Sequence, residues 1–215
     1  MEGKIRIEVL FPEIANLYGD LENIEYLKKS CPEIEVVHTH LTGEPEFLKE
    51  TPSLIYMGTL TENGQRMAVE KLSEYTDKLI EMINEGVYFL VTGNALEVFG
   101  GEIEDVDGSR DCGLKIFPTH AKRDMMHRFN SLYLGTFGDM DIVGYKSQFT
   151  HSWRDDDADD GAFESVFETK RGPGLNPDIM GEGVRKNNFM GTYVIGPLLV
   201  LNPPFAKWLL KEIGA

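Results

Sequence analysis

Residues 87–100, VYFLVTGNALEVFG, constrain the fold more than any other stretch of the sequence. The apolar run at 87–91 predicts a buried strand, the polar residues 92–94 a tight turn, and residues 95–99 the start of a helix. Such a strand–turn–helix lifts one side chain to the edge of a sheet, beside the N–H groups of the helix. A nucleophile is expected at the turn, but neither Gly93 nor Asn94 can attack a carbonyl group.

The rest of the first half predicts a parallel α/β layer. Alternating or continuous apolar runs predict strands at 5–11, 34–41 and 54–57. Helices are expected at 21–29, with Asp20 as the N-cap, and at 63–84, where apolar residues recur at helical spacing. Because short links join these elements, we expect parallel pairing in a doubly wound layer.

The second half predicts a different architecture. Strands are expected at 113–117, 130–136, 141–149, 163–169 and 189–195, and a closing helix at 203–213. Glycine-containing turns separate these strands and no long helical pattern intervenes, so antiparallel pairing is expected. The length of 215 residues predicts one domain over residues 1–215.

Composition excludes several classes of function. A net charge of −15 argues against nucleic acid and against an anionic membrane surface as partners. The two cysteines, Cys31 and Cys112, are too few for a disulfide framework and have no zinc-site spacing. No apolar run approaches the ~20 residues that span a bilayer, so we expect a cytoplasmic protein.

Other candidate sites are weak. The acidic run at 154–160, RDDDADD, does not match the spacing of an EF-hand loop, and there is no phosphate-binding loop. His38 and His40 share a strand face without a third ligand. The basic segment 121–128, AKRDMMHR, predicts a surface loop, and Cys112 a bystander thiol. We therefore expect no metal and no cofactor.

A resemblance extends along almost the whole chain. Residues 10–29, LFPEIANLYGDLENIEYLKK, resemble the opening of class I glutamine amidotransferases of the cobyric-acid-synthase type, closest to the glutaminase subunits of lipid II isoglutaminyl synthase. Segments 90–100, 112–120, 142–152 and 191–203 follow in the same order. The resemblance implies a three-layer, flavodoxin-like α/β fold with a mostly parallel central sheet and a β-rich C-terminal half.

The resemblance also implies a chemistry that this chain lacks the residues to perform. In the family a cysteine thiolate attacks the glutamine side chain, a histidine is the base, and ammonia passes to a partner synthetase that resembles a Mur ligase. Aligned with the family, the cysteine position is Gly93 and the histidine position is Ile195. We therefore expect a catalytically degenerate homologue that retains a vestigial pocket. Its expected residues are Gly58, Gly93, Asn94, Glu97, Tyr193 and Ile195.

Three interpretations stay open. The chain could be a binding or partner subunit that docks on a Mur-ligase-like or other synthetase, or that holds a small polar ligand. It could be an enzyme with altered chemistry, in which Glu97 acts as acid or base near Thr92, Asn94 and Tyr193. In the third, Ile195 has filled the old cavity and only a surface interaction remains.

Overall fold

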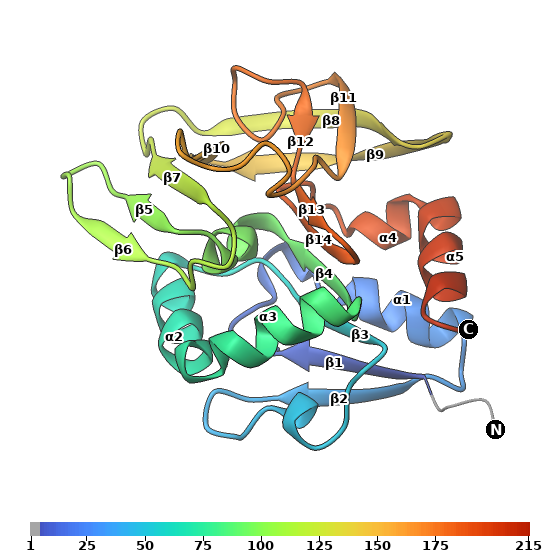
Figure 1. The fold of residues 1–215 in the computed structure, drawn as a ribbon. Helices are drawn as coiled ribbons and strands as arrows, with labels where there is room; N and C mark the ends of the chain where they lie inside the picture. Colours follow the sequence, from blue (N-terminus) through green and yellow to red (C-terminus); the bar gives the residue numbers. More distant parts are fainter. Residues whose placement is uncertain (1–4) are drawn as a thin grey trace.

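The computed structural model describes residues 5–215 and is built around a six-stranded sheet (Figure 1). Its strand order is β13-β14-β4-β3-β1-β2, and every pairing is parallel except that of β13 with β14. The order of the five parallel strands is that of flavodoxin-like folds, as the sequence predicts. The strands are β1 (Arg6–Leu10), β2 (Glu35–Thr39), β3 (Leu54–Met57), β4 (Tyr88–Thr92), β13 (Val184–Lys186) and β14 (Phe189–Thr192).

Helices cover both faces of this sheet and form two apolar cores. One core contains residues of α2 and α3, and the other contains residues of α1, α4 and α5. The strands between them are buried on both faces, which explains their continuous apolar runs. The α-helices are α1 (Glu22–Ser30), α2 (Glu62–Leu72), α3 (Thr76–Glu85), α4 (Leu198–Leu201) and α5 (Pro203–Glu212). Short 3₁₀ helices are η1 (Leu17–Gly19), η2 (Glu46–Leu48), η3 (Ser73–Tyr75) and η4 (Gly93–Phe99).

Two smaller sheets lie on the β13–β14 side of the central sheet (Figure 1). One contains β5 (Glu102–Glu104), β6 (Arg110–Cys112), β7 (Thr119–Arg123) and β10 (Thr150–Arg154). The other contains β8 (Phe129–Phe137), β9 (Met140–Gln148), β11 (Phe167–Arg171) and β12 (Gly181–Glu182). Pairing is antiparallel throughout, except that β5 and β7 are parallel, which the sequence did not indicate.

The helix expected at 63–84 is wrong as a single element. The structure breaks it at η3, where Tyr75 has φ −112° and ψ 10°. The Ser73 hydroxyl donates to the Glu70 carbonyl at 2.8 Å, and the Thr76 hydroxyl donates to the Ser73 carbonyl at 3.0 Å. Side-chain bonds of this kind compete with the helical ladder, while the apolar spacing continues across the break.

The expected strand boundaries in the second half also need correction. Residues 113–117 form a loop, because the amides of Leu114 and Ile116 donate to carbonyls of η4 rather than to a strand. The strand expected at 163–169 begins only at Phe167, and the one expected at 189–195 ends at Thr192. Segment 121–128 is not simply a surface loop, because its first three residues belong to β7 and the Arg123 side chain is buried.

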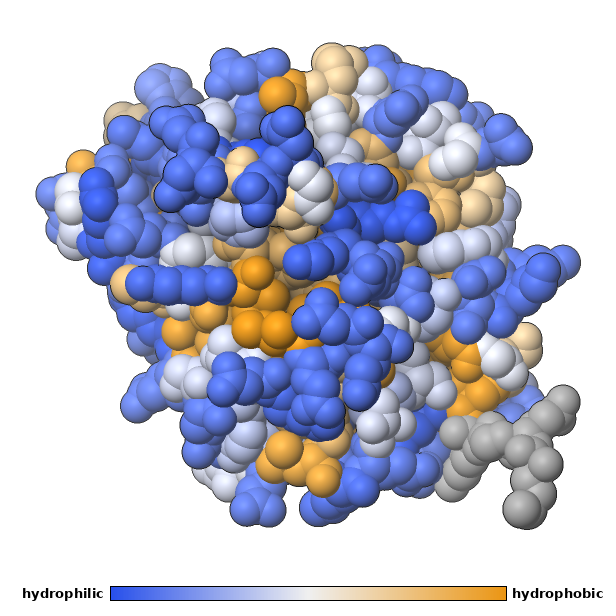
Figure 2. Space-filling model, viewed as in Figure 1, coloured by the Kyte–Doolittle hydropathy of each residue, from blue (hydrophilic) through white to orange (hydrophobic). Residues whose placement is uncertain are grey.

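The surface of the molecule is largely hydrophilic on the face shown in Figure 2. Figure 2 shows that hydrophilic residues dominate the face seen in Figure 1, with hydrophobic residues reaching it in separate patches. Between residues 5 and 215, no helix has the length and apolar character needed to cross a membrane.

Candidate functional site

The turn after β4 has the expected elbow geometry, and Thr59 fills the space beside it. Gly93 has φ +62°, a conformation that glycine adopts at little cost. A Cβ added to Gly93 would lie 2.2 Å from Thr59 Oγ1 and 2.9 Å from Thr59 Cβ. No side chain therefore fits at residue 93 while Thr59 keeps its present position.

Asp20 holds Thr59 in that position. Its buried carboxylate accepts hydrogen bonds from the Thr59 amide at 2.9 Å, from the Thr59 hydroxyl, and from the Thr92 hydroxyl at 2.9 Å. Burial raises the pKa of Asp20, although these hydrogen bonds oppose the shift. The sequence-based role of Asp20 as a helix N-cap is wrong, since Leu21 occupies the N-cap position of α1 without a side-chain cap.

A pocket of about 180 Å³ opens beside the elbow. Five of the six expected residues line it: Gly93, Asn94, Glu97, Tyr193 and Ile195. The sixth, Gly58, does not line it, because it packs against backbone, and an added Cβ would lie 2.5 Å from the Ala15 carbonyl oxygen. The cavity is therefore not filled, contrary to the third interpretation of the sequence.

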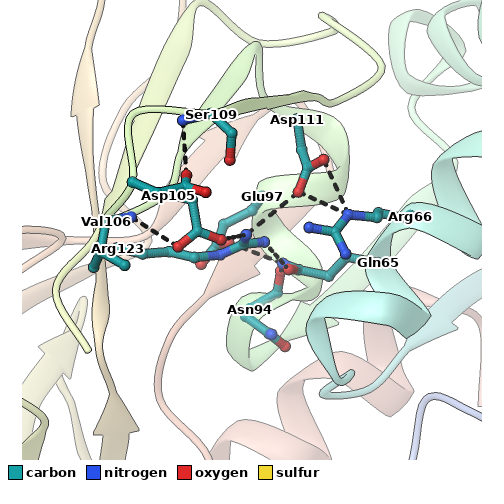
Figure 3. A network of polar contacts seen from close by, with 10 residues as sticks. Gln65, Arg66, Asn94, Glu97, Asp105, Val106, Ser109, Asp111 and Arg123 are labelled. Carbon is teal, nitrogen blue, oxygen red and sulfur yellow. Dashed lines mark hydrogen bonds and ion pairs between the residues drawn. The ribbon is translucent and has the colours of Figure 1, made fainter.

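Glu97 is buried and belongs to a polar network that reaches Arg123 (Figure 3). Its carboxylate accepts hydrogen bonds from Gln65 Nε2 at 2.8 Å and from the Tyr193 hydroxyl at 3.0 Å. Gln65 in turn accepts a hydrogen bond from Arg123 at 3.1 Å, and Arg123 donates to Asp105 at 2.7 Å. The network thus joins the elbow to α2 and to the β5–β6–β7 sheet.

Burial raises the pKa of Glu97 from its ordinary value of 4.5 to about 7. The hydrogen bonds from Gln65 and Tyr193 lower the pKa of Glu97, as does the charge of Arg123, but by less than burial raises it. The charge of Glu62 on α2 raises this pKa further. Burial and the neighbouring Glu97 charge also raise the pKa of Tyr193 well above its ordinary value. Near neutral pH the pocket therefore contains a carboxyl group that can gain or lose a proton.

Replacing Glu97 with glutamine should change how stability depends on pH. Because the pKa of Glu97 is raised in the folded state, its contribution to stability is present below 4.5 and is lost as pH rises through about 7. Between about pH 5 and about pH 8, Glu97→Gln should therefore gain about 2–3 kcal/mol in unfolding free energy relative to the wild type. Urea unfolding at both pH values measures this difference. The exposed Glu168→Gln variant should show no such gain, and an equal gain there would contradict the assignment.

A second buried network fixes the strand end that carries Tyr193 and Ile195. The fully buried side chains of Lys146 and Glu182 form an ion pair, and Lys146 also donates to the Gly174 carbonyl at 2.6 Å. Glu182 accepts from the Tyr193 amide at 2.7 Å and from the Thr192 hydroxyl at 2.8 Å. Burial lowers the pKa of Lys146, and the Glu182 charge opposes that shift.

No cysteine or histidine lines the pocket among the described residues. Cys112 lies exposed in β6, and His120 contacts Asp155 at 2.8 Å in a separate groove. His127 is exposed in the turn before β8. His151 is buried and does not line the pocket, and its Nδ1 lies 3.3 Å from Gln148 Nε2. The structure therefore brings no thiol to the elbow.

Sequence reasoning missed several residues of the site: Asp20, Thr59, Gln65, Arg123, Arg128 and Gln148. The alternation of buried and exposed residues along a strand could have placed the Arg123 side chain inside the molecule, since β7 buries every second residue and Arg123 falls on its buried face. Gln65 lies on the buried face of α2, but a polar residue does not contribute to an apolar pattern. No pattern in the sequence points to Thr59, because Thr59 occupies the space that a side chain at residue 93 would need, and this contact appears only in the folded chain.

Comparison with solved structures identifies the fold. The chain is similar to a glutamine amidotransferase from Thermotoga maritima, with a TM-score of 0.62, 11% identity, and coverage of 99% of this chain and 100% of that one. A second glutamine amidotransferase structure gives a TM-score of 0.61 at 14% identity, covering 97% and 99% of the two chains. The architecture is therefore that of a class I glutamine amidotransferase-like protein.

Sequence comparison gives a more particular relationship. The chain is 27% identical over 203 residues to the GatD subunit of lipid II isoglutaminyl synthase (glutamine-hydrolyzing) from Staphylococcus aureus, covering 92% of this chain and 79% of the relative. It is 24% identical over 222 residues to the GatD subunit from Streptococcus pneumoniae, covering 96% and 79%. No family profile matches the chain. The chain is thus distantly related to GatD.

Proposed function

We propose that this chain is a catalytically degenerate glutamine amidotransferase-like protein, which binds a small polar ligand at the elbow and does not hydrolyse glutamine through a thiolate. The observation that carries the proposal is the contact between Gly93 and Thr59. The position expected to bear the nucleophile has no side chain, and a threonine occupies the space one would need. A cysteine–histidine pair acts as a unit, so the loss of both members removes the family chemistry.

Ile195 supports the same proposal. It is buried on the pocket wall and its backbone pairs with Tyr145. An isoleucine cannot accept a proton, and His151 does not reach the pocket lining. The purified chain should release no ammonia from L-glutamine above the rate in buffer, and release at an enzymatic rate would overturn the proposal.

The open pocket supports a binding role over a purely structural one. Its volume of about 180 Å³ slightly exceeds that of an engineered cavity, about 150 Å³, that binds benzene. The related proteins are subunits of a synthase. We therefore include in the proposal a role as a partner subunit, with a Mur-ligase-like or other synthetase as the other component.

A second candidate function is an enzyme with altered chemistry in the same pocket. It is favoured by the contact between Glu97 and the Tyr193 hydroxyl at 3.0 Å, together with the pKa of Glu97 of about 7. A carboxyl group with this pKa can act as a general acid or base near neutral pH. A turnover that is lost in Glu97→Gln and follows the ionisation of Glu97 with pH would favour this candidate over pure binding.

A further inference from the structure

The outward-facing side of the β8–β9 strand pair is apolar and exposed. The two strands pair without a register shift over their full length of nine residues. Leu132 lies opposite Tyr145, and Leu134 lies opposite Val143, so these four side chains form one cluster on the same side of the pair. The exposed fraction is 66% for Leu132, 41% for Val143 and 37% for Tyr145.

Leu201 extends this cluster past the edge of β9. The Asn202 side chain bonds both backbone groups of Val143: its Oδ1 accepts from the amide at 2.8 Å, and its Nδ2 donates to the carbonyl at 2.7 Å. A Cβ added to Gly196 would lie 2.7 Å from Leu201 Cδ1 and 3.8 Å from the Tyr145 amide nitrogen, so Leu201 lies beside Tyr145. Leu201 is 44% exposed. We name this cluster the outer apolar face: Leu132, Leu134, Val143, Tyr145 and Leu201. None of its residues lines the elbow pocket.

Charge is balanced around the outer apolar face, although the whole chain is strongly acidic, with 36 acidic and 21 basic residues. At one end of the face Lys170 donates to Asp141 at 2.9 Å, and at the other end Ser147 donates to Asn130 at 2.9 Å. In β8, β9 and β11 the exposed charged residues are two of each sign: Asp141, Glu168, Lys170 and Arg171. Two copies can therefore approach through this face without the repulsion that the acidic remainder of the surface produces.

A second copy of the chain complements this face. Contiguous apolar patches exposed on a soluble protein mark contacts with other proteins, and sheets pack face to face through such side chains. In an isologous contact both copies present the same residues. When the second copy is turned end over end, the Lys170–Asp141 end of one copy lies over the Asn130–Ser147 end of the other. This arrangement opposes no like charges, and it places apolar side chains on apolar side chains.

We propose that two copies of this chain associate through their outer apolar faces, about a twofold axis that crosses β8 and β9. The axis passes between the Leu132–Tyr145 pair and the Leu134–Val143 pair. β8 and β9 lie at the opposite end of the molecule from β2 in Figure 1, so the central sheets stay outside the contact. The dimer goes beyond the proposed function, because it uses neither the elbow pocket nor a synthetase.

Sedimentation velocity on the full chain, from about 1 to about 100 μM, tests the proposal at about 0.15 M salt. A species of twice the chain mass of 24.3 kDa should form as concentration rises. Leu132→Asp should raise the dissociation constant at least about a hundredfold, because symmetry places the charge in the contact twice. Val106→Asp is the matched control and should leave association unchanged, because Val106 is 62% exposed in the turn between β5 and β6.

Leu201→Asp, on a different element, should also weaken association, and urea unfolding of each variant shows whether a lost dimer reflects a lost fold. A wild-type chain that stays monomeric at about 100 μM overturns the proposal, whichever other protein binds this face. A dimer that persists unchanged in folded Leu132→Asp overturns the assignment of the face. Equal weakening by Val106→Asp does the same, because it would show that any added charge separates the copies.

Discussion

Replacing Lys146 with methionine is expected to lower the free energy of unfolding by about 3–5 kcal/mol. The Lys146 and Glu182 side chains are both fully shielded from solvent and form an ion pair. Removing the ammonium group leaves the Glu182 carboxylate buried without its counter-charge, and it leaves the Gly174 carbonyl without that donor. Urea unfolding at neutral pH measures this loss of unfolding free energy, and the dependence of that free energy on urea concentration should be compared between the variants.

The matched control is the double variant Lys146→Met/Glu182→Gln. Glutamine keeps an acceptor for the Tyr193 amide and the Thr192 hydroxyl while removing the buried charge. The double variant should therefore be clearly more stable than Lys146→Met alone, because breaking a buried pair costs more than neutralising it. A single variant as stable as the wild type, or a double variant no better than the single, would contradict this description of the pair.

Introducing a cysteine at Gly93 is expected to lower the free energy of unfolding by about 2–5 kcal/mol. A part of this cost comes from the left-handed conformation at φ +62°, and the rest from overlap with Thr59, whose Oγ1 lies 2.2 Å from the new Cβ. Gly138→Cys is the control, because Gly138 has φ +55° with nothing within 4 Å of an added Cβ. The amount by which Gly93→Cys loses more unfolding free energy than the control measures the cost of overlap with Thr59.

A double-mutant cycle with Thr59→Gly identifies Thr59 as the obstacle. Removing the Thr59 side chain makes room at residue 93, so the double variant should be more stable than the sum of the single losses by about 1–3 kcal/mol. Additive losses, or a Gly93→Cys variant no worse than Gly138→Cys, would show that Thr59 does not exclude a side chain at the elbow.

The parallel layer could be predicted from the sequence because its elements obey local rules. The strands ending at Thr92 and Met57 read as apolar runs since both faces of the central sheet are covered. The break at Tyr75 could not be predicted, because side-chain bonds of Ser73 and Thr76 interrupt the helix while apolar spacing continues. The loop at 113–117 could not be predicted for a related reason, since its amides bond to carbonyls of η4, which is not a strand, and this tertiary contact leaves no trace in the apolar pattern.

The residues of the candidate site could be predicted where they lie in the turn and helix after β4 or directly after the neighbouring strand β14. Glu97 and Tyr193 were found from the elbow and the resemblance, and the structure brings them to a distance of 3.0 Å. Asp20 and Thr59 were not found, because their roles come from tertiary contacts across the carboxyl ends of the strands. The resemblance places Gly58 at the pocket as a glycine of the oxyanion site, yet its own backbone packs against Ala15.

Ammonia release from L-glutamine by the purified full chain tests whether the elbow has lost the glutaminase reaction. We expect a rate that equals the buffer rate and stays unchanged in the Cys31→Ser/Cys112→Ser variant, because no thiol lines the elbow pocket within the described chain. Release at an enzymatic rate that disappears in the cysteine-free variant would contradict the proposed loss of catalysis, since it would mean that a thiol from elsewhere performs the family reaction.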